Sequence, residues 1–120
     1  MEFNQYNTTV QQWIHTVLEN RETNADVVLE CCRDIIAYGR ETDDPKLIGF
    51  GCFYGGEIYY GLNDGEHFFH MMTEALTYLD RAEEWELVVR CYNYLGIASM
   101  SRGNPSIALD YYMNGLKDSD

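Results

Sequence analysis

The sequence predicts an all-α protein, an α–α superhelix of three helical hairpins with about six helices. Two observations support this fold class. The sequence matches itself without gaps when it is shifted by forty residues, and its apolar residues recur at helical spacing without the sustained alternation of a β-strand. The length of 120 residues fits one domain and leaves no room for a second. We therefore expect a single helical repeat domain over residues 1–120.

The forty-residue repeat is carried by identical or similar residues at equivalent positions. The identical pairs are Tyr38 with Tyr78, Leu47 with Leu87, Tyr54 with Tyr94, Gly56 with Gly96, and Leu76 with Leu116. A triple of small polar residues comprises Asn24, Asp64 and Asn104. These matches divide the chain into units over about residues 8–40, 44–80 and 83–117, of which the first is the most diverged.

Each unit is predicted to contain two helices, and several helix starts carry recognisable residues. Asn24, Asp64 and Asn104 have side chains that accept hydrogen bonds from the first free N–H groups of a helix. Pro105 suits the first helical position because it lacks an N–H that would be unpaired there. The segments that follow carry apolar residues at helical spacing. One such stripe comprises Phe68, Met72, Ala75 and Leu79.

Acidic residues mark the remaining turns. Asp43–Pro45 and Glu83–Glu84 are expected to lie before helices, where negative charge is stabilised by the positive end of the helix dipole. Helices are therefore predicted over residues 8–20, 24–40, 44–61, 65–80, 83–101 and 105–117, each end being accurate to about two to four residues.

The predicted helix over residues 44–61 is unusual in its glycine content. Its glycines are Gly49, Gly51, Gly55, Gly56 and Gly61. Each costs a helix about 1 kcal/mol relative to Ala. Close packing must offset this cost, or the helix is kinked and mobile. Gly56 and Gly96 fit points where two helix backbones approach closely.

The composition is that of an acidic globular protein, with 46% apolar residues and a net charge of −12. A nucleic-acid partner needs a basic patch, and an anionic membrane surface repels the same charge, so we expect neither partner. No apolar run is long enough to span a bilayer, and the N-terminus has no signal-peptide pattern. Reduced thiols in a cytoplasmic protein are therefore expected. The cysteines are Cys31, Cys32, Cys52 and Cys91.

The third unit reads Tyr92-Asn93-Tyr94-Leu95-Gly96-Ile97-Ala98, then Gly103-Asn104-Pro105, then Ala108 and Tyr112. This pattern resembles the tetratricopeptide repeat family. That family places a large residue, a Leu-Gly pair, a turn Gly, an Ala and an aromatic residue at these relative positions. The second unit matches less fully, with Gly55 in place of the Leu and Asn63 in place of the turn Gly. The resemblance covers residues 44–120 well and 8–40 loosely, and the family's usual period is about 34 residues, shorter than the forty seen here.

Three other stretches are Glu57–Asp64, Glu84–Val88 and Ala108–Tyr112. They resemble the repeat-bearing N-terminal regions of some bacterial signalling proteins, including certain diguanylate cyclases. This resemblance implies a regulatory portion of a longer protein whose other domain could be catalytic. The chain stops at Asp120 without a polar capping helix, so Ile107, Tyr111 and Leu116 are expected to lack a cover on one side.

Tetratricopeptide repeats usually bind peptides on a concave face that the first helix of each pair lines. The resemblance therefore implies a partner-binding groove. Its implied lining comprises Trp13 and Val17 in the first unit, Phe50, Phe53, Glu57 and Tyr60 in the second, and Arg90, Asn93, Ile97 and Met100 in the third. Large rigid side chains of this kind anchor peptide or helix partners. The same spacing also fits residues that simply pack on a neighbouring helix.

Other chemistry is less well supported by the residue pattern. Gly55–Tyr59 resembles the cyclase signature but lacks its second acid and lies inside a predicted helix. His67 and His70, with Glu66 and Glu74 beside them, have a spacing that can place two imidazoles on one helix face toward a metal, but no third ligand is evident. No catalytic residue and no cofactor are predicted.

These observations together predict a non-catalytic, regulatory protein-interaction module. Its expected partner is a protein or peptide, such as an intramolecular helix or a second copy of the chain. Two alternative functions stay open: a small metal- or ligand-binding protein built on His67 and His70, and a self-associating structural domain.

Overall fold

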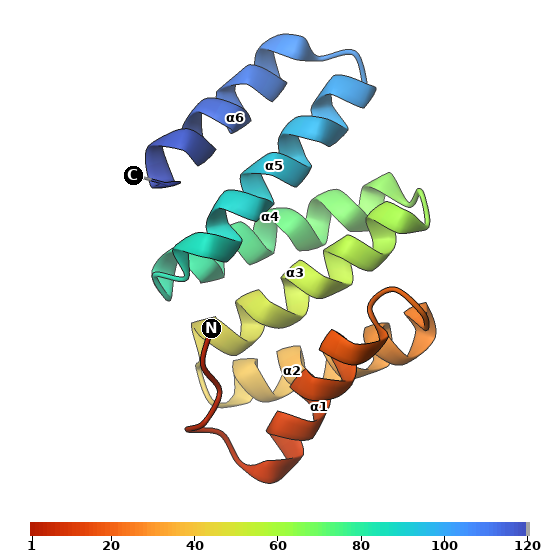
Figure 1. Cartoon of the computed structure of the whole chain (residues 1–120), viewed down its shortest axis with the longest axis vertical. Coiled ribbons are helices and arrows are strands. Elements are labelled where there is room, and N and C mark those ends of the chain that lie inside the picture. The colour runs from red at the N-terminus through yellow and green to blue at the C-terminus, as the bar shows by residue number, and fades with distance from the viewer. Residues whose placement is uncertain (120) are drawn as a thin grey trace.

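The computed structural model describes residues 1–119, with side chains described from Met1 to Lys117. It contains six α-helices and, within that range, no strand (Figure 1). The helices are α1 (Thr8–Asn20), α2 (Ala25–Glu41), α3 (Pro45–Gly61), α4 (Gly65–Arg81), α5 (Trp85–Ser101) and α6 (Pro105–Ser119). The all-α prediction is confirmed, and no helix end differs from its expected position by more than two residues.

The helices pack in sequence order. The main contacts join each helix to the next one along the chain, within the hairpins α1–α2, α3–α4 and α5–α6 and also between them. Figure 1 shows the three hairpins following one another along the longest axis, with α1, α3 and α5 toward the viewer and α2 and α4 behind them. The molecule measures 44 × 30 × 22 Å. Such serial stacking is how repeat proteins complete a core that no single hairpin could bury.

Four of the five turns share one backbone design. In the turn after α2, the N–H of Asp44 donates to the Gly39 carbonyl and that of Asp43 to the Arg40 carbonyl, which is the Schellman arrangement that ends a helix. The same pair of bonds recurs after α3, α4 and α5. The residue at the left-handed position has a φ of 52° at Asp43, 58° at Asn63, 57° at Glu83 and 77° at Gly103.

The residue that closes each of these turns also starts the next helix. Asp44 and Asp64 accept from the N–H groups of Leu47 and His67, each at 3.2 Å. Asn24, which follows the one turn of different design, accepts from Val27 N–H. The expected capping roles of Asn24 and Asp64 are thus confirmed. Glu84 makes no side-chain capping bond, so its backbone alone completes the turn.

We expect Glu83→Gly to raise the free energy of unfolding by about 0.5–1 kcal/mol. Glu83 is exposed and holds a left-handed backbone conformation, which is costly for a residue with a Cβ and free for glycine. Gly103 already holds the equivalent position. Urea unfolding followed by circular dichroism measures the change. As a control, replacing the glycine at the equivalent position, Gly103→Ala, should lower the free energy of unfolding. A loss of stability in Glu83→Gly would contradict this account of the turn.

Four of the five glycines of α3 lie at close helix contacts, as expected, whereas a Cβ at Gly61 would meet no atom within 4 Å. A Cβ at Gly49 would lie 2.7 Å from Leu79 of α4, and one at Gly51 would lie 2.6 Å from Ile36 of α2. At Gly56 it would lie 3.4 Å from the backbone nitrogen of Met72, whereas at Gly96 the space is filled by the ring of Tyr112. Helix α3 can therefore sit between α2 and α4 because small residues face both neighbours.

The last helix exposes many apolar side chains. Ile107, Leu109, Met113 and Leu116 are all exposed. Tyr111 is half-buried, and its ring lies 6.5 Å from that of Tyr92 on α5. Of the three residues expected to lack a cover on one side, Ile107 and Leu116 are thus exposed, and Tyr111 is covered on the side that faces α5.

Candidate partner-binding groove

The ten residues expected to line a groove fall into two groups. Val17, Phe50 and Phe53 are core residues with no more than 1% of their surface exposed, so all three are covered by other parts of the chain. Trp13 is half-buried and packs edge-on against Tyr38 of α2, with ring centroids 6.3 Å apart. The more accessible positions are Glu57, Tyr60, Arg90, Asn93, Ile97 and Met100.

Five of the accessible positions come together on the side of the stack formed by α1, α3 and α5, which we call the first-helix face. Two hollows lie here, of about 260 Å³ and about 210 Å³, and Tyr94 borders both. Glu57 and Tyr60 line the larger hollow, and Arg90, Asn93 and Ile97 line the smaller one. Trp13 and Met100 line neither hollow.

Glu57 is the electrostatic centre of this face. Arg21, just after α1, donates two hydrogen bonds to its carboxylate, at 3.0 and 2.7 Å. Arg90 and the Tyr94 hydroxyl, both on α5, donate at 3.1 and 2.8 Å. Only 11% of the Glu57 side chain is exposed. This Glu57 cluster therefore ties the first helices of all three hairpins together through charge-assisted bonds.

The surroundings of the cluster affect its members differently. Burial, and then the hydrogen bond to Glu57, raise the pKa of Tyr94, so its hydroxyl stays protonated and acts as a donor. The Arg90 guanidinium also lies 4.8 Å from the centre of the Phe53 ring. Two guanidinium groups share the one carboxylate of Glu57, and the side chain of Glu22 borders the same hollow.

Arg21 and Tyr94 were not identified from the sequence as members of this site. Arg21 could have been found from its spacing, because it follows the groove position Val17 by four residues and so continues the same side of the helix. The repeat gave no such signal for Tyr94, because its counterpart Tyr54 was not expected to line the groove either.

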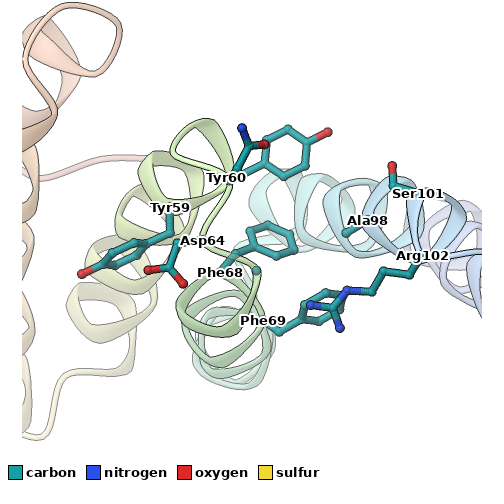
Figure 2. A pocket seen from close by; sticks show the side chains of 10 residues that line it. Tyr59, Tyr60, Asp64, Phe68, Phe69, Ala98, Ser101 and Arg102 are labelled. Atoms are coloured by element: carbon teal, nitrogen blue, oxygen red, sulfur yellow. The ribbon is translucent and has the colours of Figure 1, made fainter.

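A larger pocket lies at one end of the first-helix face, between the α3–α4 turn and the end of α5. Its volume is about 420 Å³, and Tyr60 borders it as well. Figure 2 shows Phe68 between Tyr60 and Phe69, with the Arg102 side chain lying along Phe69. The Arg102 guanidinium is 4.2 Å from the Phe69 ring centre. The pocket therefore combines aromatic walls, which suit a large apolar side chain, with the Arg102 cation and the Asp64 carboxylate.

The two histidines point to different partners. His67 Nδ1 lies 2.7 Å from Asp64 Oδ2, and its ring stacks on Tyr59 at 4.8 Å. His70 Nε2 lies 3.4 Å from Glu74 Oε2. Among the residues that the structure describes, no group of three or more His, Cys, Asp or Glu side chains could hold a metal ion.

The cysteines are all free thiols, and three of them are buried. Burial raises the pKa of Cys52 and of Cys91 to about 12 and raises that of Cys32 as well. Thiols in this state are poor nucleophiles near neutral pH. The Gly55–Tyr59 stretch lies inside α3, as expected, with Gly55 against Met71 and Glu57 held in its cluster.

Comparison with known proteins found no match: no protein-family model, no curated protein and no solved structure matches the chain. The architecture alone defines the class, an all-α protein with a helical-repeat-like fold. None of its helices up to residue 119 is both long and apolar enough to cross a membrane.

Proposed function

We propose that the chain is a non-catalytic protein-interaction module of the tetratricopeptide type, which binds a peptide or a helix on its first-helix face. The observation that carries this proposal is the set of exposed side chains on that face. Tyr60 and Ile97 are 39% and 43% exposed and border hollows whose other walls are held rigidly by the Glu57 cluster. Anchor residues of partners bind best in such preformed sites, because little conformational entropy is lost there.

The chemistry of the face favours a particular kind of ligand. The aromatic pocket at Phe68 and Phe69 accepts a large apolar side chain. The carboxylate of Glu57 already engages both Arg21 and Arg90, so a strongly acidic ligand would have to compete with an existing ion pair. An amphipathic helix or a short peptide with apolar anchors fits better than a phosphorylated or acidic segment.

We also propose a setting for this module, from its resemblance to repeat-bearing regions of bacterial signalling proteins. There it would serve as the regulatory part of a larger cytoplasmic protein such as a diguanylate cyclase. Its partner would then be a helix of the same protein or a second copy of the chain.

Peptide selection tests the proposed function. A random peptide library displayed on phage is selected on the immobilised chain, and the enriched peptides are then measured by fluorescence anisotropy. We expect Tyr60→Glu and Ile97→Glu to weaken binding at least tenfold, about 1.4 kcal/mol, because each places a charge at an apolar contact.

The matched control is Leu109→Glu, which adds the same charge at an exposed leucine of α6 away from the hollows. It should leave binding unchanged, and circular dichroism should show the same helicity in all variants. Failure to enrich any peptide, or equal binding by all three variants, would remove the first-helix face as the binding site.

A further inference from the structure

The first six residues lie against the body of the protein, although they form no helix. Figure 1 shows the N-terminus beside the beginning of α3, with the chain then looping away to enter α1. The Phe3 ring meets the Phe50 ring edge-on, with centroids 5.2 Å apart. The Tyr6 hydroxyl donates to Asp44 Oδ2 at 2.9 Å. Two aromatic side chains therefore anchor the segment Met1–Tyr6 to the start of α3.

Lys46 holds both anchors at once. Its ammonium group lies 5.0 Å from the Phe3 ring centre and 5.9 Å from that of Tyr6, and it also donates to the Glu2 carbonyl. Within the segment, the Tyr6 N–H donates to the Phe3 carbonyl at 3.2 Å. This turn brings the two rings to 6.3 Å from each other. The segment thus combines aromatic, cation–π and main-chain contacts, as a bound peptide does.

The segment covers part of the first-helix face. Beside Met1 and Phe3 an open hollow of about 220 Å³ continues along this face. We call this hollow the Phe50 groove. Its apolar walls are Leu18 of α1, Phe50 and Tyr54 of α3, and Leu87 of α5, and its charged walls are Glu84, Glu86 and Arg90. Phe50 is only 1% exposed, and part of its cover is the N-terminal segment of its own chain.

We propose that Met1–Tyr6 is an intramolecular ligand bound at the start of α3, at the edge of the Phe50 groove, and that the external ligand of this site is a short peptide that forms a turn between two aromatic residues three positions apart. This inference rests on the proposed function, since it names a ligand class for the same face. The segment joins α1 directly at Asn7, so its effective concentration at the groove is high. An external peptide binds only to molecules in which the segment has dissociated from α3. The apparent affinity for the peptide is therefore the intrinsic affinity multiplied by the fraction of such open molecules.

The test uses the full-length chain and its own N-terminal sequence as the probe. The double variant Phe3→Ala/Tyr6→Ala removes both anchors and keeps the chain length. A synthetic hexapeptide, Met-Glu-Phe-Asn-Gln-Tyr with an amidated end, is titrated into ¹⁵N-labelled protein, and chemical shifts are followed. We expect the double variant to bind this peptide at least tenfold more tightly than the wild-type chain does. The largest shifts should occur at Asp44, Lys46 and Phe50, the residues that contact the segment in the wild-type chain.

A matched peptide supplies the control. The hexapeptide with alanine in place of its Phe and Tyr should not bind the double variant. Equal binding of the two peptides, or equal affinity of the two proteins for the parent peptide, would overturn the inference. If library-selected peptides still bind in a Tyr60-dependent manner while the hexapeptide does not bind, then the inference fails and the proposed function stands. If neither kind of peptide binds, both fail.

Discussion

Phe53→Ala is expected to lower the free energy of unfolding by about 3–5 kcal/mol. The side chain is fully buried. Its ring packs edge-on against Tyr54 and Tyr94, at 5.0 and 6.0 Å, and lies under the Arg90 guanidinium. Truncation would leave a cavity between α3 and α5 and disturb the Glu57 cluster beside it. Urea denaturation monitored by circular dichroism measures the loss, which is a large share of the total stability of a small domain.

The same experiment tests whether Phe53 is a core residue or a ligand contact. Tyr60→Ala, at an exposed position of the same helix, should cost far less stability, below about 1.5 kcal/mol. A loss in Phe53→Ala as small as that in Tyr60→Ala would mean that Phe53 is not a core residue and would return it to the set of ligand contacts.

Gly49→Ala is expected to lower the free energy of unfolding by about 1–3 kcal/mol, whereas Gly61→Ala in the same helix should raise it by about 0.5–1 kcal/mol. The added methyl group at Gly49 would lie 2.7 Å from two carbons of Leu79 and 3.1 Å from its backbone nitrogen, so α3 and α4 must move apart. At Gly61 nothing lies within 4 Å, and the better helix propensity of alanine acts alone.

The two substitutions make the same chemical change. The difference between their effects on the free energy of unfolding therefore isolates the contribution of packing between α3 and α4. Both variants are measured by urea unfolding at one temperature and pH. If Gly49→Ala stabilises the protein as much as Gly61→Ala does, then the α3–α4 contact has room to spare, and the glycines of α3 need another explanation.

The helices were predictable because two local signals agreed. The repeat located equivalent segments, and residues such as Asn24 and Asp64 marked where helices begin, as their capping bonds now show. The left-handed residues were not predicted. Asp43 and Glu83 are each followed by a second acid, Asp44 or Glu84. The helix-dipole argument explains why acids occur in these turns, but it does not indicate which of the two takes the left-handed backbone conformation.

The candidate site was only partly predictable, for a different physical reason. Helical spacing tells which side of a helix a residue occupies, but not what covers that side. Phe53 and Tyr60 share one side of α3, and both rings contact that of Tyr94. Phe53 is also covered by Arg90 and is fully buried, whereas Tyr60 is 39% exposed. Phe50 is covered in part by Phe3, which lies in a segment without periodicity or motif. Such long-range cover has no signature in the local sequence.

The shared turn design sets how this architecture can change in length. From the turn after α2 onward, the chain ends one helix and starts the next with the same three-residue geometry every twenty residues. Segments bounded by two such turns can therefore be added or removed without altering the backbone at the junction. Insertion of a lone helix would, however, reverse the direction of every later one and place second helices where first helices now lie. Adding or removing two helices at a time preserves the direction of the later helices and the face on which the first helices lie. The hairpin is therefore the unit by which the protein can change in length.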